Sequence, residues 1–406
     1  MIAVNSERLM QSLADLAQIG VTSGGGVTRL ALSDEDKHGR DLLARWMRDA
    51  GLEVRVDDFG NMTGLCSGKT DAPPVLLASH IDTVVKGGKY DGALGVMGAL
   101  EVIRTLNDHG IETVKPIAIV NWTNEEGVRF EPAMQCSGAV TGRFTREYVY
   151  DRTDRQGMRF EDELRRIGYM GEEANRPLPA SAYLELHIEQ GPVLEDANQP
   201  VGVVGGIVGI TWIEVTVTGQ PDHAGPSPMR LRRDPLVAAA EIIQSVERIA
   251  TMEDDIAVAT VGRVNVEPNV INTIPGKVVF SVDFRHPDGD VLAGQVARLE
   301  ALVEHVCSER NVIGEVDRFW TSEPTPFDQD VVLAIRASCE ELGLDYGELW
   351  SGAGHDAKYM ADVCPSGMIF VRSKGGFSHS EAEESSAEDI ETGVNVLLGT
   401  AMKLAG

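Results

Sequence analysis

The chain has 406 residues, 43% of them hydrophobic and 24% charged, which suffices for two hydrophobic cores. Its 63 acidic and 36 basic residues give a net charge of −27, which excludes nucleic acid and anionic membrane surfaces as expected partners. Five scattered cysteines form no CxxC pair, and the first residues lack the basic and apolar parts of a signal peptide. No apolar run approaches the roughly 18 residues of a membrane span, so we expect a soluble cytoplasmic protein with reduced thiols.

Predicted strands and helices alternate along the first half of the chain. A helix is predicted from Ser33, which can cap it, to Gly51, which can end it. Short apolar runs bounded by turn residues predict buried strands at 73–79, 115–122 and 183–191, with a buried helix at 92–107. This alternation predicts an α/β fold with a mostly parallel sheet.

The pattern changes near residue 209. Residues 211–219 alternate between apolar and polar side chains, which is typical of an antiparallel strand with one face in water. The segments that follow give the order β-α-β-β-α-β of a small ferredoxin-like α+β domain. The first pattern then returns, with a strand at 366–371 between two helices. We therefore predict an inserted domain at 209–323 within a discontinuous domain formed by 1–208 and 324–406.

Histidines and carboxylates follow the predicted strands, at the ends of the strands or in the loops after them. They are His80, Asp91, Glu126, His187 and His379. Because the carboxyl ends of parallel strands meet at one edge of a sheet, we expect these side chains to converge there. Imidazole and carboxylate suit Zn²⁺, Mn²⁺ or Co²⁺, and these ligands can hold two ions when one carboxylate bridges them.

Two further carboxylates could assist such a site. Glu125 stands beside Glu126 and could take a proton from water while its neighbour binds metal. Asp82 lies two residues past His80 and could accept the N–H of the ring nitrogen that does not bind metal.

Each of these signals has an ordinary structural explanation when it is taken alone. A histidine after a strand is more often a hydrogen-bonded structural residue, and adjacent glutamates are common on helix surfaces. His355 fits either a residue behind the metal ligands or the start of a helix, and the acidic run at 381–389 is expected to be a solvated surface. The functional interpretation rests on the shared placement at one edge of the sheet.

Longer motifs add a resemblance to a known family. HID with DGALG, WTNEEGVRF, ELHIEQGPVLE, DHAGPSPMRLRRDP and FSHSEAE occur in this order within about residues 75 to 385. Together they resemble the hydantoinase/carbamoylase amidases of the M20 metallopeptidase-like enzymes. Members of this family include N-carbamoyl-L-amino-acid hydrolases, allantoate amidohydrolases and some β-ureidopropionases.

The resemblance implies a site for two divalent metal ions, Zn²⁺ or Mn²⁺ or Co²⁺, and assigns roles to its residues. By this resemblance, one ion is bound by His80 and His187, the other by Glu126 and His379, and both by the bridging Asp91. The resemblance also makes Glu125 the general base and gives Asp82 the role of orienting His80.

The same resemblance assigns the contacts with the substrate. It implies that Gln190 and Gly354 line the pocket, that Asn272 and Arg285 hold a substrate carboxylate, and that His223 stabilises the oxyanion. It makes the inserted domain a lid and dimerisation domain, so we expect a homodimer through residues 209–323. Without the resemblance, His223 is interpreted as a surface histidine, Asn272 as a turn residue and Arg285 as part of a surface ion pair.

Our leading hypothesis is a dinuclear metal amidohydrolase that cleaves the carbamoyl C–N bond of an N-carbamoyl-L-amino acid. The products are the amino acid, CO₂ and ammonia. An alternative keeps the metals but changes the substrate to allantoate or N-carbamoyl-β-alanine, because each of these carries a carboxylate and a ureido group. A third hypothesis is a non-catalytic binding protein on the same fold.

Overall fold

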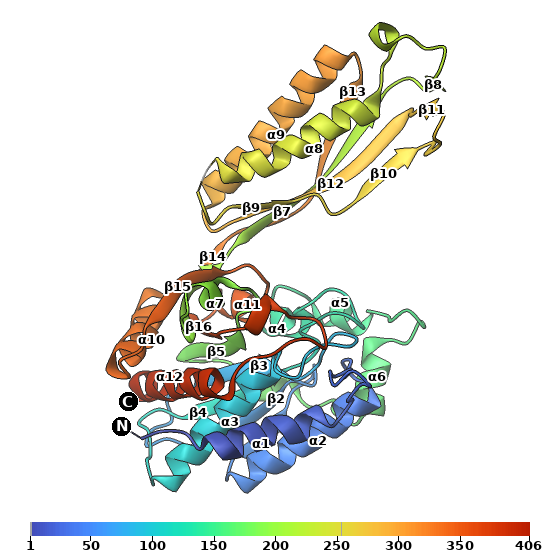
Figure 1. Cartoon of the computed structure of the whole chain (residues 1–406). Helices are drawn as coiled ribbons and strands as arrows, with labels where there is room; N and C mark the ends of the chain where they lie inside the picture. The colour runs from blue at the N-terminus through green and yellow to red at the C-terminus, as the bar shows by residue number, and fades with distance from the viewer. Residues whose placement is uncertain (1, 253) are drawn as a thin grey trace. The chain divides into compact units, whose positions relative to one another are not determined.

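The computed structural model describes residues 2–252 and 254–406, so residue 1 of the expected first domain and residue 253 of the inserted domain lie outside the described residues. The chain divides into two compact units (Figure 1). Unit 1 comprises Met1–Gly206 and Phe327–Gly406, and unit 2 comprises Ile207–Pro326. The first segment of unit 1 ends at residue 206 rather than 208, and the second begins at 327 rather than 324.

The sheet of unit 1 places four parallel strands at its centre. Its order is β1-β2-β4-β3-β5-β16-β6, and β15 also pairs with β6. The central strands β4, β3, β5 and β16 are parallel to one another, whereas β1, β2 and β6 add antiparallel edges. The bounds are β1 Glu53–Val56, β2 Met62–Cys66, β3 Val75–His80, β4 Ile117–Trp122, β5 Ala182–Ile188, β6 Val201–Ile207, β15 Tyr346–Ser351 and β16 Ser366–Val371.

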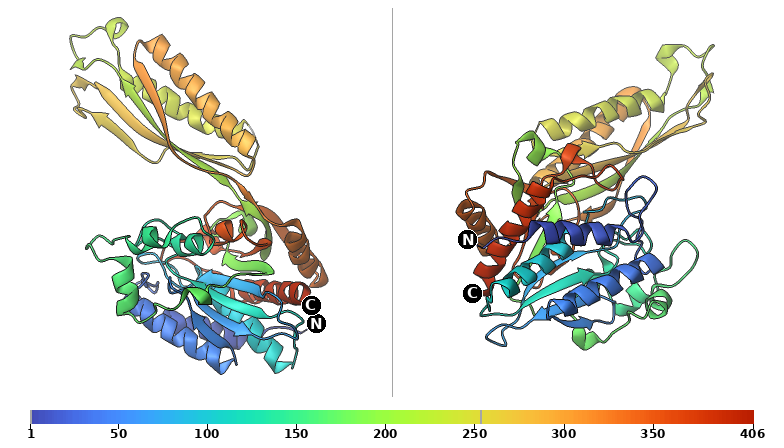
Figure 2. Two further views of the ribbon diagram at one scale, coloured as in Figure 1. Left: turned by 180° about the vertical axis from the view of Figure 1, so that it is seen from behind. Right: turned by 60° about the horizontal axis from the view of Figure 1, so that its bottom comes forward.

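The central strands are buried along their whole length, which explains why their sequences are mostly apolar. The predicted α/β fold with a mainly parallel central sheet is therefore confirmed. Figures 1 and 2 show α3 and α12 side by side against this sheet, with α1 packed on both helices. The helices of unit 1 are α1 Ser6–Ala17, α2 Asp34–Asp49, α3 Ala93–Asp108, α4 Gln135–Val140, α5 Arg146–Tyr150, α6 Phe160–Arg166, α7 Val193–Asp196, α10 Gln329–Glu341, α11 Ala357–Met360 and α12 Ala387–Ala405, with the 3₁₀ turns Glu173–Asn175 and Lys374–Gly376.

Unit 2 packs two helices against one face of an antiparallel sheet. Its strand order is β10-β12-β7-β13, with β9 beside β12. The apolar residues of β7 and β12 alternate and pack with α8 and α9 in one core, as alternation in a half-buried strand requires. The bounds are β7 Gly209–Thr218, β8 Asp222–His223, α8 Pro235–Thr251, β9 Val258–Thr260, β10 Val264–Glu267, β11 Thr273–Ile274, β12 Lys277–His286, α9 Gly289–Arg310, β13 Ile313–Ser322 and β14 Thr325–Pro326, with a 3₁₀ turn at Met229–Leu231.

Among the described residues, every helix is too short or too polar to cross a membrane.

Candidate functional site

The candidate site lies at the carboxyl edge of the central parallel strands. His80 is the last residue of β3, and His187 is the last but one of β5. Glu126 follows β4, and His379 follows β16 in a loop. Asp91 immediately precedes Gly92, the N-cap residue of α3. Because these strands run parallel, their ends bring the side chains to one edge, where ligands bind in α/β sheets.

The structure places the five predicted ligands in two groups that share Asp91. The ligand atoms of His80, Asp91 and His187 all lie within 4.8 Å of one another, and so do those of Asp91, Glu126 and His379. Oδ1 of Asp91 is 3.7 Å from Nε2 of His80 and 3.2 Å from Nε2 of His187. Oδ2 of Asp91 is 3.5 Å from Nε2 of His379, which is 3.4 Å from Glu126. Each oxygen of Asp91 therefore faces a different group.

The buried histidines are held with Nε2 towards Asp91. Nδ1 of His80 is 2.9 Å from the backbone carbonyl of Asp82, and Nδ1 of His187 is 3.0 Å from that of Ile188. A carbonyl can only accept, so each Nδ1 carries the proton and Nε2 offers its lone pair. For His187, the backbone N–H of Gly92 donates to Nε2 at 3.1 Å, which agrees with this tautomer.

Burial sets the charge of the site. It lowers the pKa of His80 to about 4, so that ring is neutral at pH 7. Burial, together with neighbouring carboxylates, raises the pKa of Glu125 and of Glu126 well above the usual range. Oε1 of Glu126 is buried and has no hydrogen-bond partner within the described part of the chain. The neutral ring of His80, crowded carboxylates and an unpartnered oxygen form a donor set that fits divalent metal ions.

Asp82 differs from its predicted role. Its backbone carbonyl, rather than its carboxylate, pairs with Nδ1 of His80, and the carboxylate lies 3.8 Å from that nitrogen. The carboxylate instead accepts the backbone N–H groups of Glu125 at 3.2 Å and Glu126 at 3.3 Å. Residues 81–84 after β3 belong to no helix, strand or turn, and the carbonyl of residue 82 faces the ring. Asp82 thus connects the loop after β3 to the loop after β4.

A cavity of about 210 Å³ opens onto the candidate ligands. Glu125 lines it and places Oε2 3.5 Å from Nε2 of His80. Gln190, also in the lining, donates from Nε2 to Oδ2 of Asp91 at 2.9 Å. The lining residues are Asp91, Glu125, Glu126, Ala133, Met134, His187, Gln190, Ala353, Gly354, His355 and His379. Gln190 and Gly354 therefore lie beside the predicted ligands, as does His355, whose ring centroid is 4.5 Å from that of His187.

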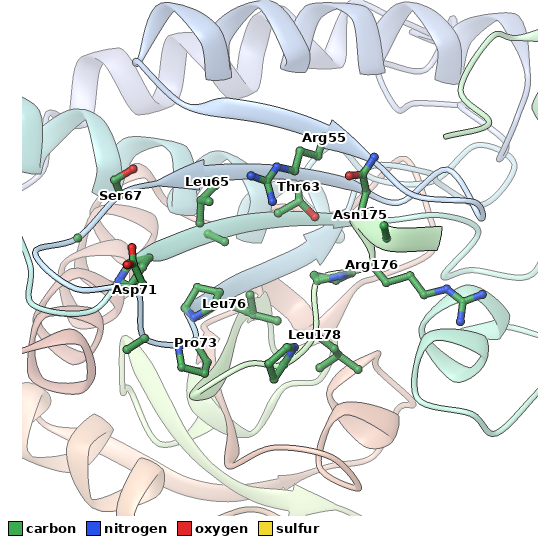
Figure 3. Close-up of a pocket in the computed structure, with 18 of the residues that line it drawn as sticks. Arg55, Thr63, Leu65, Ser67, Asp71, Pro73, Leu76, Asn175, Arg176 and Leu178 are labelled. Atoms are coloured by element: carbon green, nitrogen blue, oxygen red, sulfur yellow. The ribbon is translucent and has the colours of Figure 1, made fainter. Parts of the chain in front are cut away.

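A larger cavity of about 410 Å³ lies at the other edge of the same sheet. Pro74 and Pro116, which precede β3 and β4, line it, so it is next to the amino ends of these strands. Figure 3 shows Leu65, Leu76 and Leu178 among the side chains that line this cavity. Its lining holds no histidine and one carboxylate, Asp71, so it lacks the groups that metal-dependent hydrolysis requires.

The three predicted substrate-binding residues of unit 2 lie at two separate positions in that unit. His223 pairs with Thr273 in the short β8–β11 ladder, and the carbonyl of Asn272 accepts the N–H of Ala224 at 3.0 Å, so His223 and Asn272 are adjacent. Arg285 lies near the far end of β12 and forms an ion pair with Asp283 at 2.7 Å. Lys277, the first residue of β12, follows β11 closely in the chain, and the eight residue steps from it to Arg285 span roughly 27 Å at strand geometry.

Glu383 was not predicted as a site residue. The expectation that the run 381–389 is a solvated surface is wrong for Glu383, whose residue is only 5% exposed. Its Oε1 accepts the backbone N–H groups of Tyr90 at 2.8 Å and Asp91 at 3.1 Å. Nothing in the local sequence distinguishes Glu383 from the other glutamates of the run, because its partners lie nearly 300 residues earlier in the chain.

A parallel sheet with paired histidine and carboxylate groups at its carboxyl edge defines the class of metal-dependent hydrolases. The chain matches the description of Peptidase family M20/M25/M40 over residues 76–403. It belongs to this family, which confirms the resemblance seen in its motifs.

Relatives and solved structures match nearly the whole chain. A Rhizobium meliloti protein named N-carbamoyl-L-amino-acid amidohydrolase is 44% identical, with 99% of this chain and 97% of the relative covered. A Bacillus subtilis protein named allantoate amidohydrolase is 37% identical, with 96% and 95% covered. The crystal structure of a Burkholderia multivorans amidase of the hydantoinase/carbamoylase family superposes with a TM-score of 0.97, at 47% identity and with 100% and 98% covered.

Proposed function

We propose that the protein hydrolyses the carbamoyl C–N bond of N-carbamoyl-L-amino acids, with release of the amino acid, CO₂ and ammonia. The observation that carries this proposal is Asp91, whose two oxygens face two separate groups of candidate ligands beside the carboxylate of Glu125. The 44% identity to a protein named N-carbamoyl-L-amino-acid amidohydrolase supports this choice of substrate.

The residues that would hold the metals are already grouped. His80 and His187 would bind one ion, Glu126 and His379 the other, and Asp91 both. Zn²⁺, Mn²⁺ and Co²⁺ all accept this mixture of imidazole and carboxylate ligands. When bound, such ions supply Lewis-acid polarisation of a carbonyl oxygen and stabilise the negative charge that develops on it.

The protein's own groups would carry the proton. In this proposal Glu125 accepts a proton from the attacking water at Oε2 and returns it to the leaving nitrogen. The 3.2 Å hydrogen bond from its backbone N–H to Asp82 holds Glu125 in place at the cavity wall. Gln190 is held by its hydrogen bond to Asp91, and in this proposal it lines the part of the pocket that contacts the ureido group.

Unit 2 would serve as lid and dimerisation domain. We propose that Arg285 and Asn272 bind the substrate carboxylate, since the planar guanidinium of arginine can pair with both oxygens, and that His223 stabilises the oxyanion. Arg285 would exchange Asp283 for the substrate. His223 and Asn272 lie at one end of unit 2 and Arg285 lies near the other, so a single copy cannot present all three to one substrate. A homodimer, in which these residues come from different copies, removes this difficulty.

Allantoate remains the second candidate substrate, supported by the 37% identical relative from Bacillus subtilis. Allantoate and N-carbamoyl-β-alanine offer the same carboxylate and ureido groups, so the proposed contacts suit them too. A purely binding role has less support, because the proposed base Glu125 and four of the five proposed metal ligands line one cavity.

Ammonia release by metal-stripped and metal-restored protein tests the proposal. The assay uses N-carbamoyl-L- and D-amino acids, N-carbamoyl-β-alanine, allantoate and N-acetyl-amino acids, each with Mn²⁺, Zn²⁺ or Co²⁺. For the N-acetyl compounds, which yield acetate rather than ammonia, the free amino acid is measured instead. We expect metal-dependent release from the N-carbamoyl-L-amino acids. Ammonia release from allantoate alone would make allantoate the substrate in place of the N-carbamoyl-L-amino acids. Cleavage of only the acetyl compounds would reject carbamoyl hydrolysis.

A further inference from the structure

The loop after β16 reaches back to the backbone of Asp91. Oε1 of Glu383 accepts the N–H groups of Tyr90 and Asp91 across nearly 300 residues of sequence. Glu383 is almost fully buried, so these bonds do not compete with water. The same loop carries His379, and Asp91 is the residue that the two candidate ligand groups share. Glu383 therefore joins the backbone of the shared ligand to the segment that supplies another ligand.

Gly88 provides the space for this contact. A Cβ atom at residue 88 would lie 1.9 Å from Cδ of Glu383 and 2.0 Å from its Oε1. The φ angle of Gly88 is outside the left-handed region, so its backbone would accept other residues. The requirement for glycine at this position thus comes from the carboxylate of Glu383.

Further bonds hold the loop in a fixed shape. The N–H of Glu383 donates to the carbonyl of Ser380 at 3.2 Å, and the N–H of Lys374 donates to that of Glu384 at 2.8 Å. Ser378 donates from Oγ to Oδ2 of Asp91 at 2.8 Å. His379 itself has a φ of 53°, a left-handed conformation that persists in non-glycine residues only where the surroundings impose it.

Asp91 is consequently held from two sides by one loop. Ser378 bonds its side chain, and Glu383 bonds its backbone. Rotation of the Asp91 backbone would move both carboxylate oxygens away from the histidines that they now face at 3.2 to 3.7 Å. A group that fixes this backbone therefore fixes the distance between the two candidate ligand groups.

We propose that Glu383 is a positioning residue that locks the backbone of Asp91 to the His379 loop, so that one carboxylate can serve both halves of the metal site. This inference rests on the proposed function, because it assigns Glu383 a role towards the metal ions. It contacts neither the ions nor the substrate in this proposal and acts through Asp91.

Zn²⁺ affinity measured by competition with a chromophoric chelator tests the role without relying on catalysis. We expect Glu383→Ala to weaken binding of at least one ion by about 10- to 100-fold, as loss of a group behind a metal ligand does. Glu383→Gln should stay close to wild type, because its amide oxygen can still accept both N–H groups. Gly88→Ala should resemble Glu383→Ala, since the added methyl group displaces the carboxylate.

The double variant shows whether both changes act through one contact. We expect Gly88→Ala with Glu383→Ala to bind Zn²⁺ no more weakly than the weaker-binding single variant, as coupled sites are non-additive. Gly262→Ala is the matched control, because its Cβ would meet open space, and it should bind as wild type. If Glu383→Ala does not fold, as circular dichroism would show, the comparison of Gly88→Ala with Gly262→Ala decides the question.

Two results would overturn the inference while leaving the proposed function intact. One is wild-type affinity for both ions in Glu383→Ala or, where that variant does not fold, in Gly88→Ala. The other is a double variant whose loss is the sum of two independent losses. A wild-type protein that takes up no ion at all would instead overturn the proposed metal site, and the role of Glu383 with it.

Discussion

Asp91 combines two features that a bridging ligand needs. Its carboxylate is almost completely buried, and each oxygen faces a different candidate ligand group. Gln190 and Ser378 both donate to Oδ2, which fixes the plane of the carboxylate. A surface aspartate would rotate freely, whereas this one is oriented before any ion arrives.

Glu125 is the residue on which the proposed proton transfer depends. We expect Glu125→Gln to reduce kcat by about 100-fold or more, because the amide cannot accept a proton from water. The metal content should be unchanged, since Glu125 is not among the proposed ligands. Steady-state kinetics with elemental analysis of the same preparation checks both points. A variant with near-normal kcat would remove Glu125 as the base.

Among the elements, the turn between β3 and α3 determines how closely Asp91 approaches the histidines. Gly92 caps α3 with a φ of 63°, and a Cβ there would lie 2.4 Å from the ring of His80. We therefore expect Gly92→Ala to displace His80 and to weaken metal binding by about 10-fold or more. Gly110→Ala is the control, because it has a similar φ of 61° but open space around it.

The two glycine variants separate backbone strain from crowding at the site. Both should lower Tm, since each puts alanine into a left-handed conformation. Only Gly92→Ala should lose metal affinity in the chelator competition. Equal metal affinities in the two variants would contradict the close approach of Gly92 to His80.

The central strands were predictable because burial on both faces leaves an apolar run in the sequence, as in β3 and β4. Residues 257–266 form two short strands, β9 and β10, with Gly262 between them, where the β-α-β-β-α-β order predicts a single strand. The glycine-rich β6 was not predicted, because its small residues resemble a loop. A local sequence pattern predicts whether an element is buried, but it does not predict which other elements pair with it.

The same limit applies to the site. The ligand candidates were predictable because each follows a strand whose end the sequence marks. Glu383 was not, because its burial depends on Gly88 and Asp91, which are distant in the chain. The pairing of the Asp82 carboxylate with the loop after β4 was missed for the same reason.

At the scale of the whole molecule, the proposed homodimer makes a prediction that needs no structure of the complex. His223→Ala and Arg285→Ala should each abolish turnover. When the two variants exchange subunits or are co-expressed, the mixture should recover about a quarter of wild-type activity. Half of the dimers then contain one chain of each variant, and one of the two sites in each such dimer is intact. Kinetics on the mixture check this, and a mixture as inactive as its parts would place both residues in sites of a single chain.

The central claim is that Asp91 bridges two metal ions, and anomalous X-ray diffraction from crystals of the Zn²⁺- or Mn²⁺-loaded protein tests it most directly. We predict two anomalous peaks roughly 3.5 to 4 Å apart, one on each side of the Asp91 carboxylate. One should lie against His80 and His187, and the other against Glu126 and His379. A single peak, or peaks away from Asp91, in crystals of protein with full activity would contradict the account.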